Sequence, residues 1–139
     1  MNAEINYLAV LLAAFSAMMI GYFWYGSEEF GFGGAWAKLA KIDLKKSSTP
    51  LAMASATISA LVMAYGLAYA AFIANDYFQN SYLVNALQVG LFVWVCFQSI
   101  RMYQRARFNQ ESQAESVIHI TNEFVTVMVM ALIIGLIGI

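Results

Sequence analysis

Residues 51–74 read LAMASATISALVMAYGLAYAAFIA, a run of 24 residues without a charged side chain. A transmembrane α-helix needs about 20 consecutive apolar residues, so this stretch is long enough to cross a lipid bilayer. Three further apolar stretches of similar length lie at residues 5–25, 82–103 and 117–139. The sequence therefore predicts an all-α, integral membrane four-helix bundle. We expect two antiparallel transmembrane hairpins in a single domain that covers residues 1–139.

The composition of the chain fits a protein that folds in lipid. Of its 139 residues, 62% are hydrophobic and 11% are charged, whereas a soluble domain is about 45–50% apolar and about 25% charged. Continuous apolar segments form helices in a bilayer, because a helix satisfies its backbone hydrogen bonds within one segment. The lipid bilayer is thus the first expected partner. The chain is not basic enough to indicate nucleic-acid binding.

All seven basic residues fall in two groups, one after the first predicted span and one at the end of the third. They are Lys38, Lys41, Lys45 and Lys46 in the first group, and Arg101, Arg105 and Arg107 in the second. The positive-inside rule places such groups in the cytoplasm. We therefore expect the inner (plasma) membrane as the location, with both termini on the non-cytoplasmic side.

The connections between the spans carry local signals. Trp36, Leu39 and Ile42 recur at helical spacing among the lysines, which predicts a short amphipathic helix lying in the headgroup layer. A polar connection is expected at Asn75 and Asp76, between spans two and three. The starts of the last three spans carry residues that commonly cap helices, namely Thr49, Ser81 and Ser112.

Small residues repeat every fourth position along the first two spans. The positions are Ala13, Ala17 and Gly21 in span one, and Ala52, Ala56, Ala60, Ala64 and Ala68 in span two. In lipid, small side chains let helix backbones approach closely, and this packing supplies much of the association energy. We expect spans one and two to pack tightly along these stripes, although the stripes equally suit a neighbouring subunit.

Polar residues inside the third and fourth spans form the candidate site. They are Gln98, Arg101, His119, Asn122 and Glu123. His119 and Glu123 are four residues apart and share a helix face. An ionisable group at membrane depth costs about 2.5 kcal/mol or more, so it normally faces protein or water. Arg101 is the expected partner of Glu123. The cluster is interpreted either as a structural ion pair or as a site for proton or ion coupling or for a ligand.

No cofactor, metal site or catalytic centre is predicted. One histidine with Glu115 and Glu123 is the local supply of metal ligands, and zinc takes three or four protein ligands. The only cysteine, Cys96, lies in an apolar run. No nucleophile motif such as GxSxG is present.

The order of these features resembles the uncharacterised bacterial membrane family known as domain of unknown function 1761. Three parts of the chain carry the resemblance: Asn6–Val10 running into Gly21, Trp24–Tyr25, Phe30–Gly31 and Ala35–Leu39; Gly90–Phe97 with Trp94; and Phe108, Ile118–Phe124 and Ile133–Ile139. The resemblance implies four helices and no particular activity.

Three classes of function remain after these observations. The alanine stripes favour a non-enzymatic structural protein, acting as a homo-oligomer or as an accessory subunit of a larger membrane complex. The polar cluster favours a small ion- or proton-coupled transporter or channel that uses Glu123 and His119. An enzyme acting on lipid headgroups is the third class, and no arrangement of residues in the sequence indicates its catalytic geometry.

Overall fold

The structure of the protein is a computed structural model, which describes residues 4–26 and 29–138. This part of the chain contains four helices that are long and apolar enough to cross a membrane. The first, second and fourth are α1 (Tyr7–Tyr25), α4 (Pro50–Phe78) and α7 (Gln113–Ile137). The third runs from Tyr82 to Phe108 and consists of α5 (Tyr82–Val93), a π-helical segment η1 (Trp94–Ser99) and α6 (Ile100–Phe108). The prediction of an all-α protein with four apolar helices is confirmed.

The predicted capping residues begin three of these helices. The Thr49 hydroxyl accepts a hydrogen bond from the Ala52 amide at 3.1 Å. Ser112 accepts one from the Glu115 amide at 3.1 Å, and Ser81 accepts one from the Val84 amide at 3.3 Å. Each hydroxyl satisfies a backbone N–H that has no partner within the helix, so the chain itself determines where the helices start.

The second long helix extends one turn beyond its predicted end. Asn75 and Asp76 lie inside α4 rather than in a connection, and the helix ends at Phe78, followed by Gln79 in the left-handed conformation (φ 53°). The Asn75 carboxamide oxygen accepts a hydrogen bond from Asn85 of α5 at 3.2 Å. This bond gives the polar side chain of Asn75 a partner inside the bundle, so Asn75 is accommodated within α4. The predicted end of the fourth span, Ile139, lies outside the described residues.

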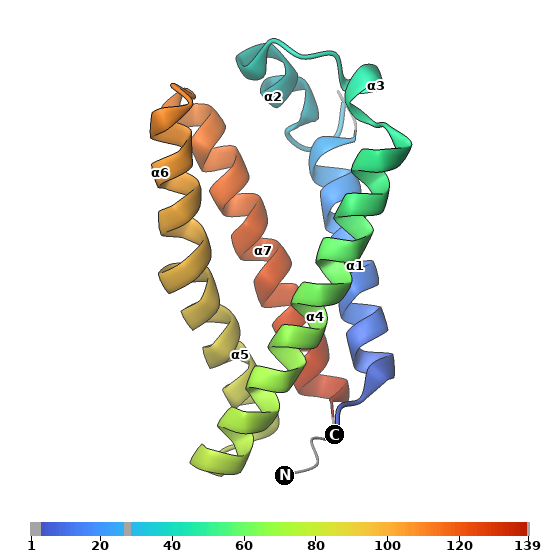
Figure 1. Cartoon of the computed structure of the whole chain (residues 1–139), viewed down its shortest axis with the longest axis vertical. Coiled ribbons are helices and arrows are strands. Elements are labelled where there is room, and N and C mark those ends of the chain that lie inside the picture. The colour runs from blue at the N-terminus through green and yellow to red at the C-terminus, as the bar shows by residue number, and fades with distance from the viewer. Residues whose placement is uncertain (1–3, 27–28, 139) are drawn as a thin grey trace.

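The four long helices form a ring in which each packs most extensively against two neighbours (Figure 1). α7 contacts α1 and α5, and α4 contacts the same two helices from the other side. Their shared core is made of small and medium apolar side chains, including Ala13, Ala64, Val127, Met130 and Ile134. Large apolar side chains such as Phe15, Val62 and Leu136 are exposed on the outside of the ring. That distribution suits a protein surrounded by lipid.

The two ends of the bundle differ. One end carries α2 (Gly33–Ala40), α3 (Leu44–Ser47) and the turn between α6 and α7, and we call it the basic end (Figure 1). The start of α1, the end of α7 and the turn between α4 and α5 lie at the opposite end (Figure 1). All seven Lys and Arg residues belong to α2, α3, α6 or the residues between α2 and α3. The orientation of this basic end toward the cytoplasm stays a prediction.

The loop at the basic end contains two short helices instead of one amphipathic helix. α2 ends at Ala40, because Lys41 adopts the left-handed conformation (φ 55°), and α3 begins after Asp43. Gly31 precedes α2 with φ 78°, and a Cβ there would meet the Phe23 carbonyl oxygen at 2.3 Å. This turn folds α2 back onto the bundle, where Trp36 packs against Tyr25 and His119. The Trp36 ring thus contacts the protein, and the location of this loop in the headgroup layer stays a prediction.

Candidate functional site

The stripes of small residues on α1 and α4 form a closed contact along only half of their length. Ala13 of α1 and Ala60, Ala64 and Ala68 of α4 are buried. They belong to the central core together with Val127 and Met130 of α7. The expected tight packing of the two stripes is present in this half, which lies toward the end opposite the basic end.

The other half of the same stripes opens into a cavity of about 520 Å³. Ala17 and Gly21 of α1 and Ala52 and Ala56 of α4 line it, and Ala60 lies at its inner limit. A Cβ added at Gly21 would meet no atom within 4 Å. In this half the small side chains face a space, so the close packing of the other half does not extend along the whole length of the stripes.

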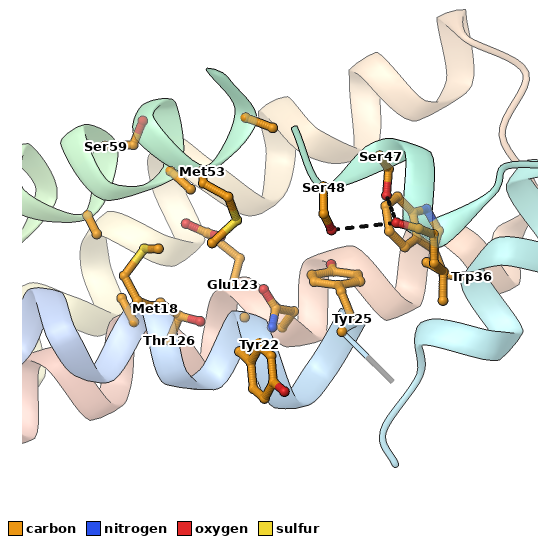
Figure 2. Close-up of a pocket in the computed structure, with 18 of the residues that line it drawn as sticks. Met18, Tyr22, Tyr25, Trp36, Ser47, Ser48, Met53, Ser59, Glu123 and Thr126 are labelled. Carbon is orange, nitrogen blue, oxygen red and sulfur yellow. Dashed lines mark hydrogen bonds between the residues drawn. The ribbon is translucent and has the colours of Figure 1, made fainter. Parts of the chain in front are cut away.

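Residues of α1, α2, α3, α4 and α7 line the cavity (Figure 2). Met18 and Tyr25 come from α1, Met53 comes from α4, and Glu123 and Thr126 come from α7. Trp36 of α2 and the serines after Leu44 close the side nearest the loop. Most of the lining is apolar, and a few polar side chains lie among it. This combination is typical of sites that bind small molecules.

Glu123 is the acidic side chain of the cavity. One of its carboxylate oxygens accepts a hydrogen bond from the Gln98 carboxamide at 3.0 Å. The same Gln98 nitrogen lies 3.3 Å from the sulfur of Met63, another lining residue. The predicted association of Gln98 with Glu123 is thus present. Gln98 holds the carboxylate from outside the cavity, and Glu123 itself faces into it.

Asn122 is the second polar group that α7 contributes to the cavity. The residue is 8% exposed, and its side-chain nitrogen is buried without a hydrogen-bond partner among the described residues. Rotation about the last side-chain torsion exchanges the amide oxygen and nitrogen at little cost, because that torsion is broad and roughly two-fold. An unpaired buried amide costs about 1–3 kcal/mol. Asn122 therefore has hydrogen-bonding capacity that the described part of the chain leaves unused.

His119 lies one turn from Glu123 but serves a different contact. Its Nδ1 atom is 2.6 Å from the hydroxyl of Tyr25, and the Trp36 ring packs against it with centroids 5.7 Å apart. Tyr25 and Trp36 are both lining residues. His119 thus supports the cavity wall from behind, and its Nε2 atom lies 4.0 Å from the Glu115 carboxylate.

Arg101 does not join the other candidate residues. Its side chain is exposed, and its guanidinium donates a hydrogen bond to Gln104 at 3.2 Å. Gln98, three residues earlier in η1, is the side chain of the third long helix that reaches Glu123. The expected pair of Arg101 with Glu123 is replaced by the contact of Gln98 with Glu123.

A separate group could hold a metal ion. Glu111, Glu115 and His119 each offer one ligand atom, and these atoms lie within 4.8 Å of one another. The sequence pointed to Glu123, not Glu111, as the second carboxylate near His119. Three ligands of this kind suit a divalent transition metal. Glu115 and His119 share one face of α7, and the turn after α6 brings Glu111 to them.

Several residues of the cavity were not predicted from the sequence, namely Tyr25, Trp36 and the methionines Met18, Met53 and Met63. In sequence, Tyr25 and Trp36 look like aromatic residues of the membrane interface. No local pattern marks these residues as a group, because they come from helices that are distant in sequence.

The π-helical segment η1 was not predicted either. Short π-helical segments inside α-helices are frequent at functional sites. Here the Trp94 indole within η1 donates a hydrogen bond to the Ile120 carbonyl of α7 at 3.2 Å. The segment therefore joins the third long helix to the helix that carries Glu123.

The comparison with known families agrees with the resemblance seen in the sequence. Residues 8–135 match the family model described as "Protein of unknown function (DUF1761)". The chain belongs to this family. No curated protein and no solved structure matches it. Membership of DUF1761, together with the four apolar helices, identifies a small membrane protein. The cavity is the feature from which a role for this DUF1761 protein can be inferred.

Proposed function

We propose that this DUF1761 protein is a small, non-enzymatic membrane carrier that binds its solute in the cavity between α1 and α4. The observation that supports the proposal is Glu123, an acidic side chain within a membrane-spanning helix that faces a cavity of about 520 Å³. Ionisable residues inside membrane-spanning helices are costly and commonly mark a path for a substrate or an ion.

The surroundings of Glu123 support a functional interpretation over a purely structural one. A structural ion pair would give the carboxylate a basic partner, whereas its hydrogen-bond donor is the neutral Gln98. The helices beside it also leave space unfilled, since a Cβ at Gly21 would have no atom within 4 Å. Protein interiors are normally packed to high density, so an unfilled volume next to an acidic group suits a ligand.

The alternative role is that of a structural or accessory subunit, which the alanine stripes favour. Ala13, Ala60, Ala64 and Ala68 are buried within this chain, so these positions need no second subunit to cover them.

The proposed carrier lies in the inner membrane with the basic end in the cytoplasm, as the positive-inside rule predicts. The cavity would then open toward the cytoplasm.

Cysteine labelling tests the carrier without knowledge of the solute. Cys96, the single cysteine, is first replaced by alanine, and Ser59→Cys then introduces a thiol into the cavity lining. The protein is reconstituted in oriented vesicles and treated with a membrane-impermeant maleimide on either side. A carrier exposes its site alternately, so we expect Ser59→Cys to react from both sides, more rapidly from the basic end.

Val62→Cys is the matched control for this experiment. Val62 lies on the same helix, and it is 67% exposed on the outer surface that we assign to lipid. A charged reagent should leave Val62→Cys unmodified. Reaction of Ser59→Cys from the basic end alone would indicate a static pocket and contradict transport. Absence of reaction from both sides, together with co-purification of a single partner protein, would favour the accessory role.

A further inference from the structure

We infer that the ligand of the cavity is an amphipathic organic cation, a molecule with one positive charge and a bulky apolar body. This inference rests on the proposed function, because it concerns the same cavity, and it adds the chemical class of the solute. The carboxylate of Glu123 beside apolar and aromatic walls leads to this class.

The charge of the lining selects for cations. Glu123 is the single charged side chain among the described lining residues, and no lysine, arginine or histidine is among them. The basic side chains of α2, α3 and α6 therefore leave the Glu123 carboxylate without a cationic partner inside the cavity. In a medium of low dielectric constant, an anionic ligand beside this carboxylate would be strongly repelled, and a cationic ligand would be attracted.

The walls select for an apolar body. Met18, Met53 and Met63 contribute flexible, polarisable thioethers that adapt to ligands of irregular shape. Aromatic rings, which favour cations through their electron-rich faces, come from Tyr22, Tyr25 and Trp36. A ligand that fills this space would bury its apolar surface against these side chains, so a larger apolar body is bound more tightly.

A small inorganic cation fits the site poorly. Ca²⁺ takes six to eight oxygen ligands, and Mg²⁺ requires an octahedral set. The cavity offers one carboxylate, the side-chain oxygens of Asn122 and Thr126, and hydroxyls of serine and tyrosine. The hydroxyls of Ser47 and Ser48 already bond to the Leu44 carbonyl, and that of Tyr25 is paired with His119. The remaining lining is mainly methionine, alanine and aromatic side chains, which do not bind a hard cation. An organic cation needs only a charge partner and one or two hydrogen bonds, and the unused amide of Asn122 can supply one.

Gln98 acts as a positioning residue for this site. Its carboxamide nitrogen donates to one oxygen of Glu123 at 3.0 Å, and Gln98 itself is not a lining residue. The bond fixes the carboxylate at the edge of the cavity. Replacement of Gln98 by leucine should weaken binding of a cation less than replacement of Glu123, because the charge remains.

Tetraphenylphosphonium and tetraphenylborate provide a matched pair of probes, since they share a shape and carry opposite charges. Binding of each to the purified protein in a neutral detergent is measured by isothermal titration calorimetry. We expect tetraphenylphosphonium to bind with 1:1 stoichiometry and tetraphenylborate to bind at least about tenfold more weakly, because like charges repel in a medium of low dielectric constant. By the same principle, Glu123→Gln should weaken tetraphenylphosphonium binding at least about tenfold and leave tetraphenylborate binding equal or stronger.

Two further variants control for charge and for folding. Asp76→Asn removes one negative charge at the opposite end of α4 and should leave both affinities unchanged. Gly21→Leu fills the cavity and should weaken tetraphenylphosphonium binding while the protein keeps its melting temperature. Equal binding of both probes, or binding that is unaffected by Glu123→Gln in a protein that melts normally, would overturn the inference. If Ser59→Cys still reacts from both sides in that case, the proposal of a carrier is retained and only the inference about the class of ligand is rejected.

Discussion

The two halves of the contact between α1 and α4 have the same sequence pattern and different structures. Toward the end that holds the start of α1, Ala13 and Ala64 are fully buried, and the helices pack closely. Toward the basic end, Gly21 and Ala56 line the cavity. Figure 1 shows α4 leaning across α1 rather than running parallel to it. Small residues thus permit close approach of two helices, and the crossing of the helices decides where that approach occurs.

Both halves are completed by α7, but with different side chains. Val127, Met130 and Ile134 fill the closed half and are completely buried. The open half is lined by Asn122, Glu123 and Thr126. The change from apolar to polar residues along one helix therefore coincides with the change from packing to cavity. The open half therefore differs from the closed half in the polarity of its side chains as well as in its packing.

The largest expected effect comes from enlarging a residue in the closed half. Ala64→Leu inserts a bulky side chain where the alanine has 0% exposure, and overpacking of this kind costs about 3 kcal/mol. Ala56→Leu makes the same change in the open half and should alter the free energy of unfolding by about 0.5 kcal/mol or less. Unfolding in mixed detergent, followed by circular dichroism, measures both. Equal losses in the two variants would contradict the difference between the halves.

A second effect is expected at the close contact between α5 and α7. A Cβ at Gly90 would lie 2.8 Å from the Cβ of Ala131, and neither atom can rotate away. Gly90→Ala should therefore lower the free energy of unfolding by about 1–2 kcal/mol, although alanine favours helices. The same unfolding measurement tests this. An increase in stability would show that α5 and α7 can move apart at Gly90 without lowering the free energy of unfolding.

A smaller effect is expected at the wall of the open half. Tyr25→Phe removes the hydroxyl that lies 2.6 Å from Nδ1 of His119 and keeps the aromatic ring. Loss of such a hydrogen bond costs about 1 kcal/mol. The imidazole resonances of His119 should shift in NMR spectra of the variant, while those of Trp94, which bonds to Ile120, should stay in place. Unchanged His119 resonances would contradict the contact.

The smallest expected effect is a gain in stability. Gly21→Ala adds a methyl group where no atom lies within 4 Å, and alanine is more favourable than glycine in a helix by up to about 1 kcal/mol. The melting temperature should therefore rise slightly or stay constant. This result would contrast with the loss expected for Gly90→Ala, since the two substitutions are chemically identical. A clear loss at Gly21 would mean that the cavity is closed in solution.

Part of the site could be predicted from the sequence. Gln98, Asn122 and Glu123 are recognisable because polar residues in apolar helices are conspicuous, and Gln98 does contact Glu123. Arg101 belongs to the same group by α-helical spacing, but its side chain is exposed and bonds to Gln104 instead. The contact of Trp36 with His119 could not be predicted, because it depends on the turn before α2 that folds this helix onto the bundle.

The sequence by itself determined the four apolar helices, their capped starts and the gathering of all basic residues in two segments. These features follow from local chemistry, because the length of an apolar run and the identity of a capping residue act within one segment. Only the tertiary structure decided that α1 and α4 diverge, that a cavity forms beside Glu123 and that Arg101 is exposed and does not line this cavity. Those outcomes depend on how rigid helices cross and fill space together, and no single segment contains that information.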